Sequence, residues 1–107
     1  GVDFNAHGMT WDQANDRFLV INSSDDTLYS IDVLTGAATV LTTLSQDFQT
    51  VGLELDPISG VLFACTGPDL LTVDPSTGAV TVLGPIWLDP SCDDLGATWI
   101  DSPCLEP

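Results

Sequence analysis

The chain has 107 residues, 44% of them hydrophobic, which is enough for one small domain with a modest core. Sixteen acidic residues face a single base, Arg17, so the formal net charge is −15 at pH 7. Nucleic-acid binding needs a basic surface and is therefore excluded. No apolar run approaches the ~20 residues that span a bilayer, so we expect no membrane insertion. The chain starts at Gly1 rather than Met, which fits a processed or excised segment.

The sequence contains an internal repeat. Three glycines 44 residues apart open similar segments, namely GMTWD from Gly8, GLELD from Gly52 and GATWID from Gly96. Farther along, TLYSIDVLTGAATVL from Thr27 matches DLLTVDPSTGAVTVL from Asp69 at an offset of 42. The repeats therefore run about 3–46 and 47–90, and a partial third repeat covers 91–107.

Each full repeat is rich in β-branched and aromatic residues and shows no sustained helical period, which predicts short strands. We expect strands near 8–12, 17–23, 27–32 and 37–44, and again near 51–55, 61–66, 69–74 and 79–84. The predicted fold class is all-β, with two four-stranded antiparallel propeller-like blades plus the first strand of a third.

A five-residue turn pattern recurs four times, as DQAND at 12–16, DVLTG at 32–36, DPISG at 56–60 and DPSTG at 74–78. Asp opens the turn because its carboxylate can accept from backbone N–H groups two residues on. Gly closes it because the last position needs a positive φ. The first copy has Asp16 in place of Gly. These turns predict two hairpins per repeat.

Taken together, the G-x-x-W/L-D strand, the D-x-x-[ST]-G turns and the T-G-x-x-T-V-L segment resemble bacterial extracellular β-propeller repeats of the NHL and YVTN groups. The resemblance covers nearly all of residues 3–101 and implies a blade-like unit. It implies no particular activity, because such blades serve enzymes, receptors and scaffolds alike.

Two blades are too few for a closed propeller, which needs about four. We therefore expect the chain to associate with itself, as a closed homo-oligomer or a head-to-tail filament, or to be an excerpt of a longer array. The surplus first strand is the predicted assembly segment. This strand can exchange with the same strand of a neighbouring chain, or it can begin a blade that other chains complete. The third alternative is an open packing of the chains instead of a closed ring. The residues of the assembly segment are Gly96, Ala97, Thr98, Trp99, Ile100 and Asp101.

Two pairs of adjacent aspartates are not explained by the turn pattern, Asp25–Asp26 and Asp93–Asp94. Loop carboxylates are what Ca²⁺ prefers, so these four are candidate calcium ligands, although solvated loop charge is the simpler interpretation. No other cofactor is indicated. His7, the single histidine, aligns with Val51 and Leu95 in the other repeats, which favours a strand position near the core over catalysis.

The three cysteines are Cys65, Cys92 and Cys104. Cys65 aligns with Ile21 and is expected in the core. We prefer a Cys92–Cys104 disulfide, with a disulfide between chains as the alternative, and either implies an oxidising compartment. The chain is therefore expected to be secreted or on the cell surface.

Three further residues are singled out by the sequence. Trp11 aligns with Trp99, and core packing of the first strand accounts for both. Trp87 has no equivalent in the other repeat and is a candidate contact residue. Asn22 begins an N-S-S glycosylation sequon.

The sequence thus predicts a non-catalytic structural or binding module that acts by assembling through its blades. The alternative is an excerpt of a larger propeller enzyme or lectin, with its ligand site in the central channel.

Overall fold

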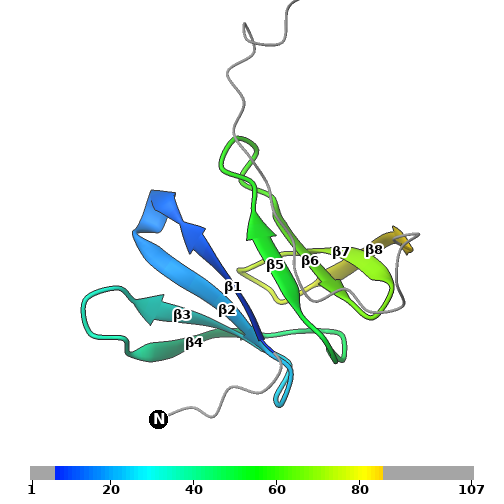
Figure 1. The fold of residues 1–107 in the computed structure, drawn as a ribbon, viewed down its shortest axis with the longest axis horizontal. Coiled ribbons are helices and arrows are strands. Elements are labelled where there is room, and N and C mark those ends of the chain that lie inside the picture. Colours follow the sequence, from blue (N-terminus) through cyan, green and yellow to red (C-terminus); the bar gives the residue numbers. More distant parts are fainter. Residues whose placement is uncertain (1–6, 86–107) are drawn as a thin grey trace, which may run out of the picture.

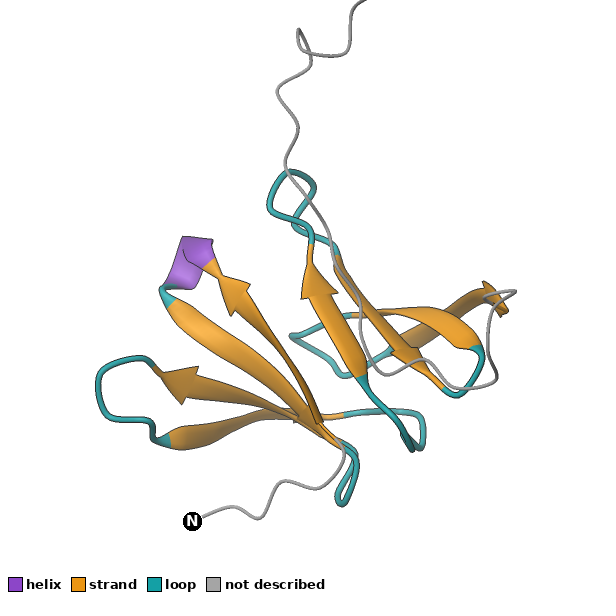
Figure 2. Ribbon diagram, viewed as in Figure 1, coloured by secondary structure: helices purple, strands orange, loops and turns teal. Residues whose placement is uncertain are grey.

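Eight strands and one short helical turn make up residues 7–85, the part of the chain that the computed structural model describes (Figure 1). The strands form two separate antiparallel sheets, each in sequence order and neither closed into a barrel (Figure 2). Sheet 1 holds β1 (His7–Asp12), β2 (Arg17–Asn22), β3 (Thr27–Asp32) and β4 (Ala38–Thr43). Sheet 2 holds β5 (Gly52–Leu55), β6 (Leu62–Thr66), β7 (Asp69–Val73) and β8 (Val80–Pro85).

These eight strands are the predicted ones, and their ends agree to within one residue. The all-β prediction with two four-stranded antiparallel units is therefore confirmed. The repeat also extends to irregularities, since each sheet has a register shift in its last strand pair, at Leu28/Tyr29 and at Leu70/Leu71. The predicted first strand of a third repeat, at 96–101, lies outside the described residues.

The predicted Asp-to-Gly turns are confirmed at three of the four sites. Asp32 accepts from Leu34 N at 2.8 Å, Asp56 from Ile58 N at 3.0 Å, and Asp74 from Ser76 N at 2.9 Å. The closing glycines have the expected positive φ of 74°, 76° and 80° at Gly36, Gly60 and Gly78. The hydrogen bond from the backbone N–H of Leu34 does most to lower the pKa of Asp32. Hydrogen bonds from the hydroxyl groups of Ser59 and Ser76 do most to lower the pKa of Asp56 and Asp74, respectively.

The fourth turn differs from the prediction. After β1 the chain forms a 3₁₀ turn, η1 (Gln13–Asn15), and Asp16 closes it with a φ of 50°. Aspartate tolerates this left-handed conformation better than most residues, so a glycine is not essential there. The carboxylate of Asp12 accepts from the side chains of Asn15 and Arg17.

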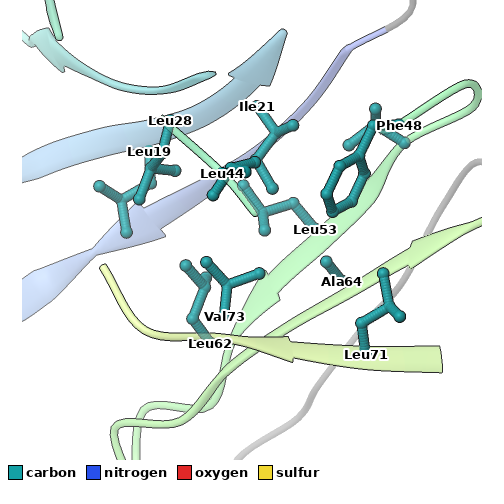
Figure 3. Packing of buried hydrophobic residues seen from close by; sticks show 11 residues of the cluster. Leu19, Ile21, Leu28, Leu44, Phe48, Leu53, Leu62, Ala64, Leu71 and Val73 are labelled. Carbon is teal, nitrogen blue, oxygen red and sulfur yellow. The ribbon is translucent and has the colours of Figure 1, made fainter. Parts of the chain in front are cut away.

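One apolar cluster fills the space between the two sheets (Figure 3). Sheet 1 contributes Leu19, Ile21 and Leu28, and the segment between the sheets adds Leu44, Phe48 and Val51. Sheet 2 contributes the side chains that line its near face, which are Leu53, Leu62, Ala64, Leu71 and Val73. At roughly 25 cal/mol per Å² of buried apolar area, this shared cluster is the main force that holds the sheets together.

The two sheets approach each other most closely along their first strands. β1 and β5 lie side by side (Figure 1), and the N–H of Leu55 donates to the hydroxyl of Thr10 at 3.0 Å. A β-carbon at Gly8 would lie 2.9 Å from the carbonyl oxygen of Val51 and 3.1 Å from the nitrogen of Leu53. The first glycine of the repeat is therefore needed for contact between neighbouring units, which its spacing alone does not reveal.

The segment between the sheets is held by polar contacts to both sheets. On the sheet 1 side, Asp26 accepts from Leu44 N through its carbonyl and from Phe48 N through its carboxylate, both at 2.8 Å. On the sheet 2 side, Ser45 N donates to the carbonyl of Gly78 at 3.0 Å, and the Ser45 hydroxyl accepts from Val80 N at 3.0 Å. Turn residues of both sheets thus position the connection.

Candidate functional site

A cleft opens between the hairpin ends of the two sheets. Its volume is about 1090 Å³, and it is lined by β1, η1, the end of β5 and the turn that follows β5. Residues of sheet 1 in its wall include Trp11, Asp12 and Arg17, and those of sheet 2 include Leu55 and Pro57. The cleft exists because the first strands touch near Gly8 while the η1 turn and the turn after β5 extend beyond that contact.

The cleft contains the only basic side chain of the protein, Arg17. Its Nε donates to Oδ2 of Asp12 at 2.9 Å, and Nδ2 of Asn15 donates to the same oxygen at 2.9 Å. Burial by itself raises the pKa of Asp12, but the bonds from Asn15 and Arg17, together with the arginine charge, outweigh it and lower the pKa below its ordinary value. Arg17 therefore neutralises Asp12 and is already engaged.

Trp11 is more exposed than the sequence led us to expect. Its side chain is 39% exposed and packs edge-on against Phe18, with ring centroids 5.0 Å apart and an interplanar angle of 65°. The expectation that core packing accounts for Trp11 is therefore wrong. Its strand lies at the edge of sheet 1, and its side chain points to the face turned away from sheet 2, where no described strand covers it.

That face carries a set of apolar side chains, which we call the outer face of sheet 1. Strand pairing places its members on one side, because directly paired residues share a face. Met9 is 56% exposed and Val40 57% exposed, whereas Val20 and Tyr29 on the same face are buried. The whole set is Met9, Trp11, Phe18, Val20, Tyr29, Ile31 and Val40. The alignment of the repeats could have shown this apolar face, since Met9 aligns with Leu53 of the cluster and Trp11 with Leu55, which packs against the cluster.

The candidate calcium ligands at 25–26 have protein partners. The hydroxyl of Tyr29 donates to the carboxylate of Asp25, and Phe48 N donates to that of Asp26. Within residues 7–85, no three His, Cys, Asp or Glu side chains are grouped closely enough to hold a metal ion. Asp93 and Asp94 lie outside the described residues, so calcium binding there stays a prediction.

The remaining predicted residues divide between the two parts of the chain. Asn22 is only 1% exposed and its amide oxygen accepts from Ser24 N at 3.2 Å, which is at odds with glycosylation of that side chain. Cys65 is fully buried in β6, as expected, and His7 begins β1. Cys65 is also disulfide-bonded. Because the chain has three cysteines, this bond excludes the preferred Cys92–Cys104 pairing, which is therefore wrong. The other predicted residues lie outside the described residues, namely Trp87, Cys92, Cys104 and the assembly segment 96–101.

Within residues 7–85, no helix has the length and apolar character that crossing a membrane requires.

The fold defines a class of protein, the all-β repeat protein in which each repeat forms one four-stranded antiparallel sheet. The chain belongs to the family described as "Repeat of unknown function (DUF6923)", whose model matches residues 3–102. No curated protein and no solved structure matches the chain.

Proposed function

We propose that the protein is a non-catalytic structural or binding module that acts by assembling with copies of itself through its blade-like sheets. The observation that carries the proposal is the outer face of sheet 1, where Met9, Trp11 and Val40 are all more than one-third exposed on one side of one sheet. Met9 and Trp11 lie two residues apart on the edge strand β1, and exposed apolar side chains that gather in this way mark interaction surfaces more often than single ones do.

The arrangement of the sheets supports the same proposal. Each sheet is an open four-stranded unit, and sheet 1 and sheet 2 share a single apolar cluster between them. Open repeat units of this kind bury their apolar faces by stacking on neighbours. Among the described strands none packs on the outer face of sheet 1, and a second copy would bury it in a closed propeller or in a filament.

Secretion or display on the cell surface belongs to this proposal. Its support is the disulfide bond of Cys65, because disulfides form and persist in oxidising compartments. Relation to extracellular propeller repeats of the NHL and YVTN type is likewise proposed, on the resemblance of the strand and turn pattern and on the four-stranded units.

The mass of the intact chain in solution tests the assembly. Light scattering across about 5 to 500 µM should give a mass that is a multiple of 11.3 kDa and rises with concentration. A mass of 11.3 kDa throughout this range would contradict self-assembly.

A second candidate function is a ligand-binding excerpt of a larger propeller enzyme or lectin. The cleft of about 1090 Å³ favours it, because Trp11, which is 39% exposed, is one of the residues that line it. Aromatic faces are good platforms for small ligands in such sites. Saccharides that bind there should change the tryptophan fluorescence of the wild type, and Trp11→Ala should remove that change.

A further inference from the structure

The two sheets have outer edges that differ in how well they are protected. The strands of each sheet lie in sequence order, so β4 forms the edge of sheet 1 opposite β1, and β8 forms the outer edge of sheet 2 (Figure 1). A strand at an edge presents backbone N–H and C=O groups that no neighbouring strand uses. These groups can pair with a strand of another molecule unless something covers or interrupts them.

The edge of sheet 2 is closed at both ends of β8. At its start, the N–H of Val80 donates to the hydroxyl of Ser45 at 3.0 Å, and the carbonyl of Gly78 accepts from Ser45 N at 3.0 Å. At its end, β8 runs through Gly84 and Pro85, and a proline has no N–H to offer to a further strand. This edge is therefore a poor template for another chain.

The edge of sheet 1 has backbone groups that point outward. Asp32 N donates to the carbonyl of Ala37 at 2.9 Å, which fixes this pair as a hydrogen-bonded one. Hydrogen-bonded and non-hydrogen-bonded pairs alternate along an antiparallel ladder, so the N–H groups of Ala38 and Val40 point away from β3. β4 thus offers the hydrogen-bonding groups that an added strand needs.

No described residue covers the start of this edge. Ala38 is the equivalent of Val80 and Gly36 that of Gly78, but within residues 7–85 nothing bonds to them as Ser45 does in sheet 2. Gly36 also has nothing within 4 Å of an added β-carbon. The same edge that is covered in sheet 2 is therefore open in sheet 1.

The end of β4 limits the open part of the edge. A β-carbon added to Gly78 of sheet 2 would lie 2.0 Å from the carbonyl oxygen of Thr43 and 2.8 Å from the hydroxyl oxygen of Thr42. These two residues are therefore already beside sheet 2. The part of β4 that is open to a partner is residues 38–41.

The open edge is also free of charge. Residues 33–46 contain no charged side chain, in a chain whose net charge is −15. Like charges that lie directly opposite each other destabilise paired strands, so two such copies can approach best where neither has a charge. A basic partner would instead be drawn to the acidic turns. A second copy of this chain is therefore the partner that fits β4.

Resting on the proposed self-assembly, we propose that two copies pair through β4, edge to edge and antiparallel, so that their first sheets become one continuous sheet across a two-fold axis.

The pairing would also join the apolar surfaces of the two copies. The side chain of Val40 lies on the outer face of sheet 1 and is 57% exposed. Strands that pair in one sheet share their faces, so the two outer faces would become neighbours at this residue. The same strand serves on both sides, which makes the contact isologous, and it is complete with two copies.

Val40→Pro tests the pairing. The substitution removes an N–H that points outward and leaves the hydrogen bonds between β3 and β4 in place. The two-fold axis applies the change to both chains, so we expect the dissociation constant of the dimer to rise at least about tenfold. Light scattering of the wild type should level off at twice 11.3 kDa, and the variant should remain at 11.3 kDa at the same concentrations.

Val82→Pro is the matched control. Val82 is the equivalent of Val40 in β8, is 50% exposed, and its N–H points away from β7 by the same alternation. The same substitution on the other edge should leave the dimer intact. Circular dichroism checks that each variant is folded. Val40→Glu and Val82→Glu form a second matched pair, which replaces the first if a proline variant does not fold.

Met9→Glu separates the pairing of edges from the stacking of outer faces. Met9 lies on the same face as Val40 but on β1, at the opposite edge of the sheet, so a dimer paired through β4 should tolerate this charge. Loss of the dimer in the Val40 variants alone supports the proposal.

The other outcomes distinguish this inference from the proposed function. A wild type that stays monomeric overturns both. Assembly that survives the Val40 substitutions, or that is lost in the Val82 variants or in Met9→Glu, overturns the pairing through β4 and leaves self-assembly in place. A mass that rises beyond twice 11.3 kDa does the same, because the paired edges are complete with two copies.

Discussion

Tyr29 is the single tyrosine of the chain and lies buried in β3, with its hydroxyl donating to the carboxylate of Asp25. This bond, together with burial and the negative charge of Asp25, raises the pKa of Tyr29 above its ordinary value of 10.0. A raised pKa means that the folded state favours the neutral phenol. The associated stability is complete below pH 10 and is lost as the pH rises through the folded-state pKa.

Titration of the tyrosine absorbance at 295 nm measures this shift directly. The midpoint in the folded wild type should lie above 10, and the Asp25→Asn variant should titrate at lower pH because the charge is gone. Ser24→Ala, next to Asp25 in the same loop, should leave the midpoint unchanged. Equal midpoints for wild type and Asp25→Asn would contradict the assigned bond.

Single residues show how far the sequence could go. The roles of Asp32, Asp56 and Asp74 were predictable because each carboxylate binds N–H groups two or three residues away, and local spacing encodes local contacts. Asp26 was not predictable, because its carboxylate binds Phe48, 22 residues away. The exposure of Trp11 depends on which face of its strand has a partner, and one strand's sequence does not record that.

At the scale of elements, the strands were predictable because hairpin turns fix the strand ends and alternation fixes the faces. The repeat also predicted that both units have the same topology. The cleft was not predictable, because it depends on how far the η1 turn and the turn after β5 extend past the contact of β1 with β5. Such a distance is a property of two units together.

The contact of β1 with β5 provides the element-scale prediction. Gly8→Ala places a carbon 2.9 Å from the carbonyl oxygen of Val51 and 3.1 Å from the nitrogen of Leu53, and these backbone atoms have little room to yield. We expect a loss of about 1–3 kcal/mol in the free energy of unfolding, the usual cost of overpacking. Chemical denaturation at a concentration where the chain is monomeric measures it.

Gly36→Asn is the control for that measurement. Gly36 has a φ of 74°, which asparagine tolerates, and nothing lies within 4 Å of an added β-carbon. This variant should lose less stability than Gly8→Ala. Equal stability of Gly8→Ala and wild type would show that the sheets can separate at β1 and β5 without cost, contrary to the close packing described above.

At the scale of the whole molecule, charge opposes both folding and assembly. A net charge of −15 on 107 residues makes each copy repel the next, and the outer face of sheet 1 can bind a partner only if apolar burial exceeds that repulsion. Salt shortens the reach of the repulsion from about 10 Å at 0.1 M to about 3 Å at 1 M. Assembly and thermal stability should therefore rise together with ionic strength.

Melting temperature and mass, measured from 0.05 to 1 M NaCl, check this expectation. A fall in both with rising salt would contradict it.

A second experiment tests calcium by comparing the melting temperature and mass in 2 mM CaCl₂ with those in NaCl of equal ionic strength. Asp25 and Asp26 should add nothing specific, because their carboxylates already accept bonds from Tyr29 and Phe48. A larger rise with calcium that Asp93→Asn or Asp94→Asn removes would assign a site to that pair. The same rise in all variants would be screening alone, since a divalent ion neutralises dispersed carboxylates without a site.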